Sequence, residues 1–148
     1  MSTQQKKVFA STQKYNELQN VYWTDIGFCQ QGQDDPEFIH GLWDTGCTVT
    51  TVSKCLADKL ALPVIGKVNS ATAGGLIECD RHIVNIYLPN KVRIANLIIM
   101  SNPILTVDCL IGTDIICKGD FSVSNFQDKT TVSFRMPSQE ETDYTDFI

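Results

Sequence analysis

The sequence has no long hydrophobic run. None of its apolar stretches approaches the roughly 18 residues that a membrane-spanning helix needs, so we expect no membrane partner. Near the amino terminus, MSTQQKKVFASTQKYNELQN contains no apolar segment of secretory length. We therefore expect no signal peptide and a cytoplasmic protein.

An excess of positive charge is also absent. The 148 residues carry 12 Lys and Arg against 17 Asp and Glu, which gives a formal net charge of -5 at pH 7. Binding to nucleic acid needs a basic surface that neutralises phosphates, so nucleic acid is not an expected partner. Hydrophobic residues at 43% and charged residues at 20% are typical of a globular chain, and the length suits one domain.

The sequence has few metal ligands at useful spacings. Its histidines are His40 and His82, both in strand-like stretches where a surface or paired position is the simpler interpretation. The six cysteines form no CxxC pair, so no standard zinc spacing occurs and we expect neither a metal nor a cofactor. Reduced thiols that pack as small hydrophobic side chains are the favoured interpretation. The cysteines are Cys29, Cys47, Cys55, Cys79, Cys109 and Cys117.

Short β-branched and aromatic segments, separated by turn residues, fill most of the chain. Gly32 and Pro36 mark a turn between two such segments, and Pro89 with Asn90 marks another. Many short strands at regular spacing, with one or two short helices, predict an all-β fold, a small closed or nearly closed β-barrel. The predicted strands cover residues 21–30, 37–43, 48–53, 64–71, 76–88, 91–100, 120–126 and 130–136, and residues 109–116 switch from a short strand to a helical turn.

The remaining segments are a helix and the two ends of the chain. Ser53 is expected to cap a short helix over residues 54–62, which Pro63 stops. Residues 1–19 are polar without sustained periodicity and predict an arm that is mobile or forms a short helix. Residues 137–148 form an acidic tail that we expect to be loose. The predicted domain is therefore residues 20–136.

Asp44 occupies an unusual position in the sequence. It follows the apolar run at residues 41–43 and forms a small turn with Thr45 and Gly46, ahead of a β-branched run. Aspartate is a poor strand residue, so a charge at the end of an apolar strand indicates a function. The simpler alternative is that Asp-Thr-Gly is only a turn, since Asp and Gly are common turn residues.

Three segments together resemble the motifs of one protein family. LWDTGCT (42–48) resembles the active-site loop of the aspartic proteases, and LIGTDII (110–116) resembles the aliphatic-glycine segment that packs across that loop. TAGG (72–75), between two predicted strands, resembles their glycine-rich flap tip. About 30 residues separate the loop from the flap, and about 35 separate the flap from the aliphatic-glycine motif. With this spacing, residues 20–136 are similar to the single-domain, retropepsin-like aspartic proteases, especially their bacterial and phage-type members.

The resemblance implies a closed β-barrel of the retropepsin (acid protease) type with one or two short helices, assembled as a two-fold homodimer. Hydrolysis of a peptide by carboxylates needs a general base that activates water and a general acid that protonates the leaving nitrogen. The chain has one DTG and no DSG, so the second carboxylate has to come from a second copy. A two-fold axis through the site would give each Asp44 its partner.

The resemblance also assigns supporting roles around Asp44. Residues of the loop would hold it in shape, and the flap would close over an extended peptide substrate. Residues of the aliphatic-glycine motif would pack against the loop. The loop residues are Thr45, Gly46 and Cys47, and the flap residues are Thr72, Ala73, Gly74 and Gly75. The residues of the aliphatic-glycine motif are Leu110, Ile111, Gly112 and Asp114.

Several of these residues have simpler alternatives. The Gly-Gly pair at 74–75 is by itself typical of a plain hairpin turn. Asp114 fits a structural acid in the first turn of a short helix better than a catalytic one. Cys47 fits a small packed side chain better than a redox-sensitive thiol that disables the site on oxidation. Thr48 and Thr113 stand where retroviral members carry an acid and an arginine, so the contacts of that pair are not expected here.

The sequence therefore predicts an aspartic endopeptidase, active as a homodimer on peptide or protein substrates, with Asp44 of both chains as the catalytic pair. The alternative is a dimeric protease-fold module that binds peptides or scaffolds an assembly with little turnover. The intact DTG argues against this alternative, because a binding module does not need a charge at the axis. A metal-dependent hydrolase is disfavoured because the histidines are too few and are poorly placed.

Overall fold

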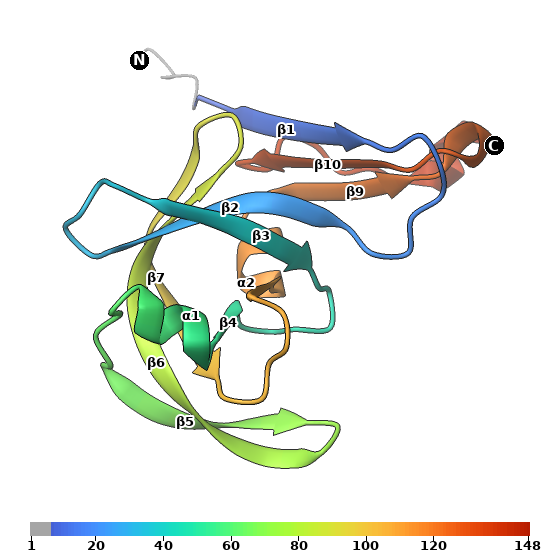
Figure 1. Ribbon diagram of the computed structural model, residues 1–148. Coiled ribbons are helices and arrows are strands. Elements are labelled where there is room, and N and C mark those ends of the chain that lie inside the picture. Colours follow the sequence, from blue (N-terminus) through green and yellow to red (C-terminus); the bar gives the residue numbers. More distant parts are fainter. Residues whose placement is uncertain (1–6) are drawn as a thin grey trace.

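The computed structural model describes residues 7–148, whose regular secondary structure is mostly β-strand (Figure 1). None of the helices in these residues is long and apolar enough to cross a membrane. The strands are β1 (Phe9–Lys14), β2 (Trp23–Gln30), β3 (Glu37–Trp43), β4 (Thr51–Ser53), β5 (Gly66–Thr72), β6 (Gly75–Leu88), β7 (Val92–Asn102), β8 (Cys109–Ile111), β9 (Asp120–Ser124) and β10 (Thr131–Met136). The helices are α1 (Lys54–Lys59) and α2 (Thr113–Ile116), with short 3-10 turns η1 (Phe126–Asp128) and η2 (Tyr144–Phe147).

Six of the strands close into a barrel, as the sequence predicts. The large sheet has the order β2-β3-β8-β4-β7-β6-β5, and β6 also pairs with β2, which closes the ring and leaves β5 outside it. Most pairs are antiparallel, but β3–β8 and β4–β7 are parallel. Closure leaves few unpaired strand edges.

The interior of the barrel is filled by aliphatic and aromatic side chains from all of its strands. In β2, burial alternates poorly because Ile26, Gly27, Phe28 and Cys29 are all buried between neighbouring layers. At Gly41 of β3, a Cβ atom would come within 2.7 Å of the Ile26 side chain, so only glycine allows this approach. The side chains with the least exposure are Ile26, Phe28, Val52, Val84, Ile86, Val92, Ile99, Ile111, Ile115 and Phe134.

Helix α1 begins as the sequence predicts. The Ser53 side-chain oxygen accepts a hydrogen bond from the Leu56 N–H at 3.1 Å, which caps the first turn. The helix ends at Lys59, three residues earlier than the predicted 62, because Ala61 turns the chain with a φ of 48°. Pro63 therefore follows the end of the helix instead of causing it.

A second sheet of three strands, in the order β1-β10-β9, lies at one end of the barrel, and the β5–β6 hairpin lies at the other (Figure 1). The face of the small sheet that packs on the barrel carries Phe121 and Phe134, whose ring centroids lie 5.0 Å and 5.3 Å from that of Trp43. Trp43 is the last residue of β3. The small sheet therefore packs directly against the residue that precedes Asp44.

The expected amino-terminal arm is wrong for residues 9–14, which form strand β1 instead of a mobile segment or helix. Residues 1–6 of that expected arm lie outside the described residues. The segment FASTQK is polar because one of its faces is open to solvent, so its sequence has little apolar alternation. Its strand structure comes from pairing with β10, more than 100 residues away in the chain.

The expected loose tail is fixed to the small sheet over its first residues. Asp120, at the start of β9, accepts hydrogen bonds from the Gln139 N–H at 2.9 Å, from Arg135 Nε at 2.6 Å and from the Ser138 hydroxyl. Arg135 also pairs with Glu140 at 3.0 Å. These donors lower the pKa of the Asp120 carboxyl to about 2, chiefly through Ser138, Gln139 and Arg135 in that order.

The direction in which β1 presents its backbone groups follows from two hydrogen bonds. The Tyr15 N–H donates to the Thr130 carbonyl at 2.8 Å, so the odd-numbered residues of β1, Ser11 among them, bond to β10. The even-numbered residues, Thr12 among them, face the other way, where Asn90 Nδ2 donates to the Ala10 carbonyl at 2.8 Å.

We expect Ser11→Pro to lower the free energy of unfolding by about 1–3 kcal/mol more than Thr12→Pro, because only the first removes an interstrand donor and leaves a β10 carbonyl without its partner. Urea unfolding of the two variants beside the wild type measures this difference. Equal effects of the two prolines would contradict the strand assignment of β1.

The Asp120 cluster predicts a pH dependence. Because the folded pKa lies below the usual value of 3.8, the carboxylate contributes stability above about pH 4 and loses it as the pH falls to about 2. The difference in unfolding free energy between wild type and Asp120→Asn should therefore be largest above pH 4 and shrink toward zero by pH 2. A difference that stays constant over this range in urea titrations would contradict the assignment.

Candidate active site

Asp44 stands at the end of β3, where its backbone and side chain are both held. The Asp44 N–H donates to the Ile111 carbonyl at 3.0 Å, which ties the loop to β8. The Gly46 N–H donates to Asp44 Oδ1 at 2.8 Å, as expected for a turn that orients the carboxylate. Asp44 is partly exposed, and Thr45 and Gly46 are exposed. The carboxylate is thus oriented by backbone and open to solvent.

The structure brings the two sequence motifs together. Strands β3 and β8 pair in parallel, with Leu42 opposite Leu110 and Trp43 opposite Ile111. After β8, the Thr113 N–H donates to the Cys47 carbonyl at 2.8 Å. These contacts place the aliphatic-glycine motif directly across the Asp44 loop.

Gly112 is the closest point between the two motifs. A Cβ atom at this position would lie 2.7 Å from the Cys47 carbonyl oxygen and 3.0 Å from the Thr50 nitrogen. Both atoms are backbone and cannot move aside without displacing the loop. Glycine is required here for space rather than for an unusual φ angle.

Asp114 is the acid that holds the loop in place. Its Oδ2 accepts from the Thr50 N–H at 2.9 Å, and its Oδ1 accepts from the Thr50 hydroxyl at 2.7 Å and from the Ile115 N–H at 2.9 Å. The Thr50 oxygen in turn accepts from the Gly112 N–H at 3.1 Å. Both carboxylate oxygens of Asp114 are therefore occupied within its own chain, and the structural role that the sequence favours for Asp114 stays a prediction.

Thr50 is the residue of this network that sequence reasoning missed. It is fully buried and links Asp114 to Gly112. Its only signal in the sequence is a threonine within a β-branched run, which is too common to single it out. Its partner is 64 residues away, so only the fold reveals the link.

Cys47 is half-buried behind the loop. Its thiol donates to the Val49 carbonyl at 2.9 Å and lies 3.7 Å from the Thr51 hydroxyl oxygen. Burial raises the pKa of the Cys47 thiol, so the protonated, less reactive form prevails at neutral pH. These observations favour a packed side chain over a redox-sensitive thiol.

The four flap residues of the sequence analysis form the tip of the β5–β6 hairpin. Thr72 pairs with Gly75, and Gly75 has a φ of 115°, a conformation that favours glycine. The Thr72 hydroxyl donates to the Gly75 carbonyl at 2.9 Å and accepts from the Gly74 N–H at 3.2 Å. In Figure 1 the tip points to the same side of the barrel as the loop that follows β3. Next to the tip, Leu76 is 75% exposed.

A cavity of about 370 Å³ adjoins Asp44 and Thr45. Its other walls come from the segment before β2, from the end of β3 and from β9. The lining is largely apolar, so this cavity offers a surface on which an apolar side chain can pack beside the carboxylate. The additional lining residues are Asn20, Val21, Tyr22, Leu42, Trp43 and Phe121.

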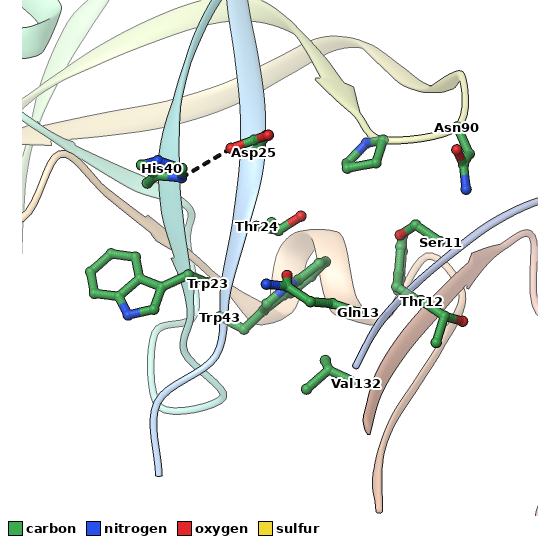
Figure 2. Close-up of a pocket in the computed structure, with 12 residues that line it drawn as sticks. Ser11, Thr12, Gln13, Trp23, Thr24, Asp25, His40, Trp43, Asn90 and Val132 are labelled. Carbon is green, nitrogen blue, oxygen red and sulfur yellow. Dashed lines mark ion pairs between the residues drawn. The ribbon is translucent and has the colours of Figure 1, made fainter. Parts of the chain in front are cut away.

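Neither histidine lines the cavity beside Asp44. His40 forms an exposed cross-strand ion pair with Asp25, with 2.9 Å between Nδ1 and Oδ1. This pair borders a separate cavity of about 450 Å³. Figure 2 shows the His40–Asp25 pair on the side of the cavity opposite Ser11 and Thr12 of β1. His82 is buried, with Nδ1 3.0 Å from the Pro63 carbonyl and Nε2 2.9 Å from the Ser101 hydroxyl.

The structure shows no metal-ligand arrangement and no disulfide in the residues it describes. Within residues 7–148, no three His, Cys, Asp or Glu side chains come together in a way that would hold a metal ion. All six cysteines, which lie in this range, have free thiols.

The closed six-stranded barrel, the Asp-Thr-Gly loop after β3 and the glycine motif packed across it define a single-lobed fold of the aspartic-protease type. No protein-family model matches the chain, and no curated protein matches it. A retropepsin-like aspartic protease from Rickettsia conorii superimposes with a TM-score of 0.57 and 11% identity, over 88% of this chain and 96% of that one. The chain therefore has the fold of the retropepsin-like aspartic proteases, which confirms the resemblance seen in the sequence.

Two viral proteases are also similar, at lower scores. The Simian Foamy Virus (mac) protease has a TM-score of 0.44 and 14% identity, over 64% of this chain and 91% of that one. The EIAV protease, solved with a bound inhibitor, has a TM-score of 0.46 and 21% identity, over 69% of this chain and 89% of that one.

We expect Asp114→Asn to lower the free energy of unfolding by about 2 kcal/mol, because the carboxylate accepts three charge-assisted hydrogen bonds from Thr50 and Ile115. The matched control is Asp35→Asn, at an exposed aspartate between β2 and β3, with an effect within about 0.5 kcal/mol. Urea unfolding of both variants measures the two effects. A cost at Asp114 no larger than the cost at Asp35 would contradict the role of this network.

Proposed function

We propose that this protein is an aspartic endopeptidase that acts as a homodimer, with Asp44 of each subunit as the catalytic pair. One observation carries the proposal. The Asp44 carboxylate is oriented by the Gly46 N–H and stays open to solvent beside a cavity, whereas Asp114, the acid of the second motif, is fully engaged by Thr50 and Ile115. The second catalytic carboxylate is therefore assigned to another copy of the chain.

A pair of adjacent carboxylates provides the chemistry that peptide hydrolysis needs. Two carboxyl groups in close contact do not both ionise, because the two negative charges would repel each other, so the pair shares one proton. The ionised carboxylate takes a proton from the attacking water, and the protonated one hydrogen-bonds the peptide carbonyl and later donates a proton to the leaving nitrogen. The two-fold axis makes the two carboxylates equivalent, so either can take either role.

The neighbouring residues have roles that follow from this pairing. Thr45 is exposed beside Asp44, where it is free to hydrogen-bond the backbone of the partner's loop across the axis. The flap tip at residues 72–75 closes over an extended peptide and pairs with its backbone as an added strand. The exposed Leu76 and the apolar cavity beside Asp44 favour apolar side chains next to the cleaved bond.

The proposal includes a cytoplasmic location. Six free thiols suit a reducing compartment better than an oxidising one.

We expect Asp44→Asn to lower kcat/KM by at least about 100-fold, because the amide cannot act as a general base. The assay is cleavage of a peptide library between pH 4 and 7, with mass-spectrometric detection. Asp35→Asn is the control for the loss of one exposed carboxylate, and unfolding midpoints verify that both variants fold. Full activity in Asp44→Asn would overturn the proposal, and tight peptide binding without cleavage by the wild type would indicate a binding module instead.

A mixing experiment with the same variant tests whether one site draws on two chains. When wild type exchanges subunits with an equal amount of Asp44→Asn, about half of the wild-type subunits pair with an inactive partner, so the activity per wild-type chain should fall by about half. Excess Asp44→Asn should abolish it. Activity that does not respond to the variant would show that each chain carries a complete site.

A further inference from the structure

The small sheet β1-β10-β9 has two outer edges that differ in character. Strand β10 is paired on both sides within its own chain, with β1 on one side and β9 on the other. The unpaired backbone groups of this sheet therefore belong to β1 and β9. Such edges attract further strands unless charged side chains, bulges or other contacts block them.

The outer edge of β1 carries contacts that discourage pairing. The Asn90 side-chain Nδ2 donates a hydrogen bond to the Ala10 carbonyl oxygen at 2.8 Å, so this outward carbonyl already has a partner. Lys14 places a charged side chain near the end of the same strand. A lysine and an occupied carbonyl are typical of strand edges that stay single.

The outer edge of β9 is open in the part of the chain that the structure describes. Odd-numbered residues of β10 bond to β9, since the even-numbered ones bond to β1. Ser122 and Ser124 lie opposite Ser133 and Thr131, so their backbone N–H and C=O groups point toward β10. The backbone groups of Phe121 and Val123 therefore point outward, away from β10. Residues 121–124 carry no charge and no proline, so nothing in this stretch prevents another strand from pairing.

Strand β9 also borders the cavity beside Asp44. The Phe121 ring packs at 5.0 Å against Trp43, the residue before Asp44. Phe121 also borders the cavity that Asp44, Thr45 and the 43%-exposed Val21 line. A strand added to β9 would therefore bring its own chain toward Asp44.

From these observations we infer that two copies of the chain join edge to edge through β9, without exchange of their terminal strands. This inference rests on the proposed homodimeric function. A two-fold axis normal to the sheet pairs β9 with β9 antiparallel and joins two sheets of three strands into one continuous sheet. Because β1 of the same chain already fills the other side of β10, β10 has no place for a strand of the partner.

Proline scanning of the two edges tests which one forms the interface. Val123→Pro removes an outward N–H of β9 without breaking a bond to β10, and two-fold symmetry doubles the loss in each dimer. We expect the dimer dissociation constant to rise at least about tenfold. Thr12→Pro, the matched change on the outer edge of β1, should leave the dissociation constant unchanged. Sedimentation over a concentration series measures both.

A second pair of variants guards against misfolding of the proline variant. Ser122 is exposed, so Ser122→Lys places a positive charge on each β9 without filling the core. Like charges on neighbouring strands repel, so the dimer should weaken and recover as salt rises. Thr12→Lys is the matched control and should show neither effect. A dimer that is insensitive to both Val123→Pro and Ser122→Lys would overturn the inference.

A disulfide trap tests whether β1 stays with its own chain. Thr12 and Ser133 lie directly opposite each other, with their hydroxyl oxygens 2.9 Å apart. In the double variant with Thr12→Cys and Ser133→Cys, oxidation should give a single-chain mass on a denaturing, non-reducing gel, while the native protein remains a dimer. Each single variant controls for the six native thiols. A covalent dimer, or no cross-link, would overturn the inference.

The outcomes separate this inference from the proposed function. A dimer that survives the β9 variants, or one that exchanges β1, would remove the β9 interface but leave the Asp44 pair intact. An active wild-type monomer, or an active Asp44→Asn protein, would remove the proposed function and this inference with it.

Discussion

The site depends on one constraint, the close contact between the Asp44 loop and the glycine motif that follows β8. Parallel pairing of β3 with β8 brings the two segments side by side, and Gly112 leaves room for the Cys47 carbonyl and the Thr50 amide. Asp114 then accepts two hydrogen bonds from Thr50, so this partly buried acid holds the loop, while Asp44 is partly exposed and accepts one hydrogen bond from the Gly46 N–H. Both oxygens of Asp114 accept hydrogen bonds, whereas Asp44 accepts one, so the proposed function assigns the chemistry to Asp44 and a structural role to Asp114.

The different surroundings of Asp44 and Asp114 are the reason why we propose a second copy of the chain as the source of the other catalytic carboxylate. A protomer offers one oriented, open carboxylate at the end of β3, and general acid–base hydrolysis of a peptide uses two. Symmetry supplies the second carboxylate without any new sequence, provided that the interface places the two loops together. The small sheet is suited to that task, since Phe121 of β9 packs against Trp43, directly before Asp44.

The chain differs from a minimal barrel at its two ends. The amino-terminal segment adds β1 to the outer side of β10, and the tail is bound back onto the sheet through Asp120 and Arg135. Both additions stabilise the small sheet from within the protomer. They also leave residues 121–124 of β9 as an edge without charged side chains. This is why we infer that a second copy associates through β9 and not through β1.

Local signals in the sequence were sufficient for much of this structure. Turn residues at 31–36 and 89–90 separated the strands correctly, Ser53 marked the start of α1, and the LWDTGCT segment identified the Asp44 loop, because turns, caps and short motifs depend on neighbouring residues. Pairing between distant segments was decided only by the tertiary structure. The polar stretch FASTQK became a strand through β10, Thr50 became a structural residue through Asp114 at 64 positions' distance, and the outer edge of β9 became open because β10 was already paired on both sides. No local pattern encodes these relations, since each depends on which partner the closed barrel brings into contact.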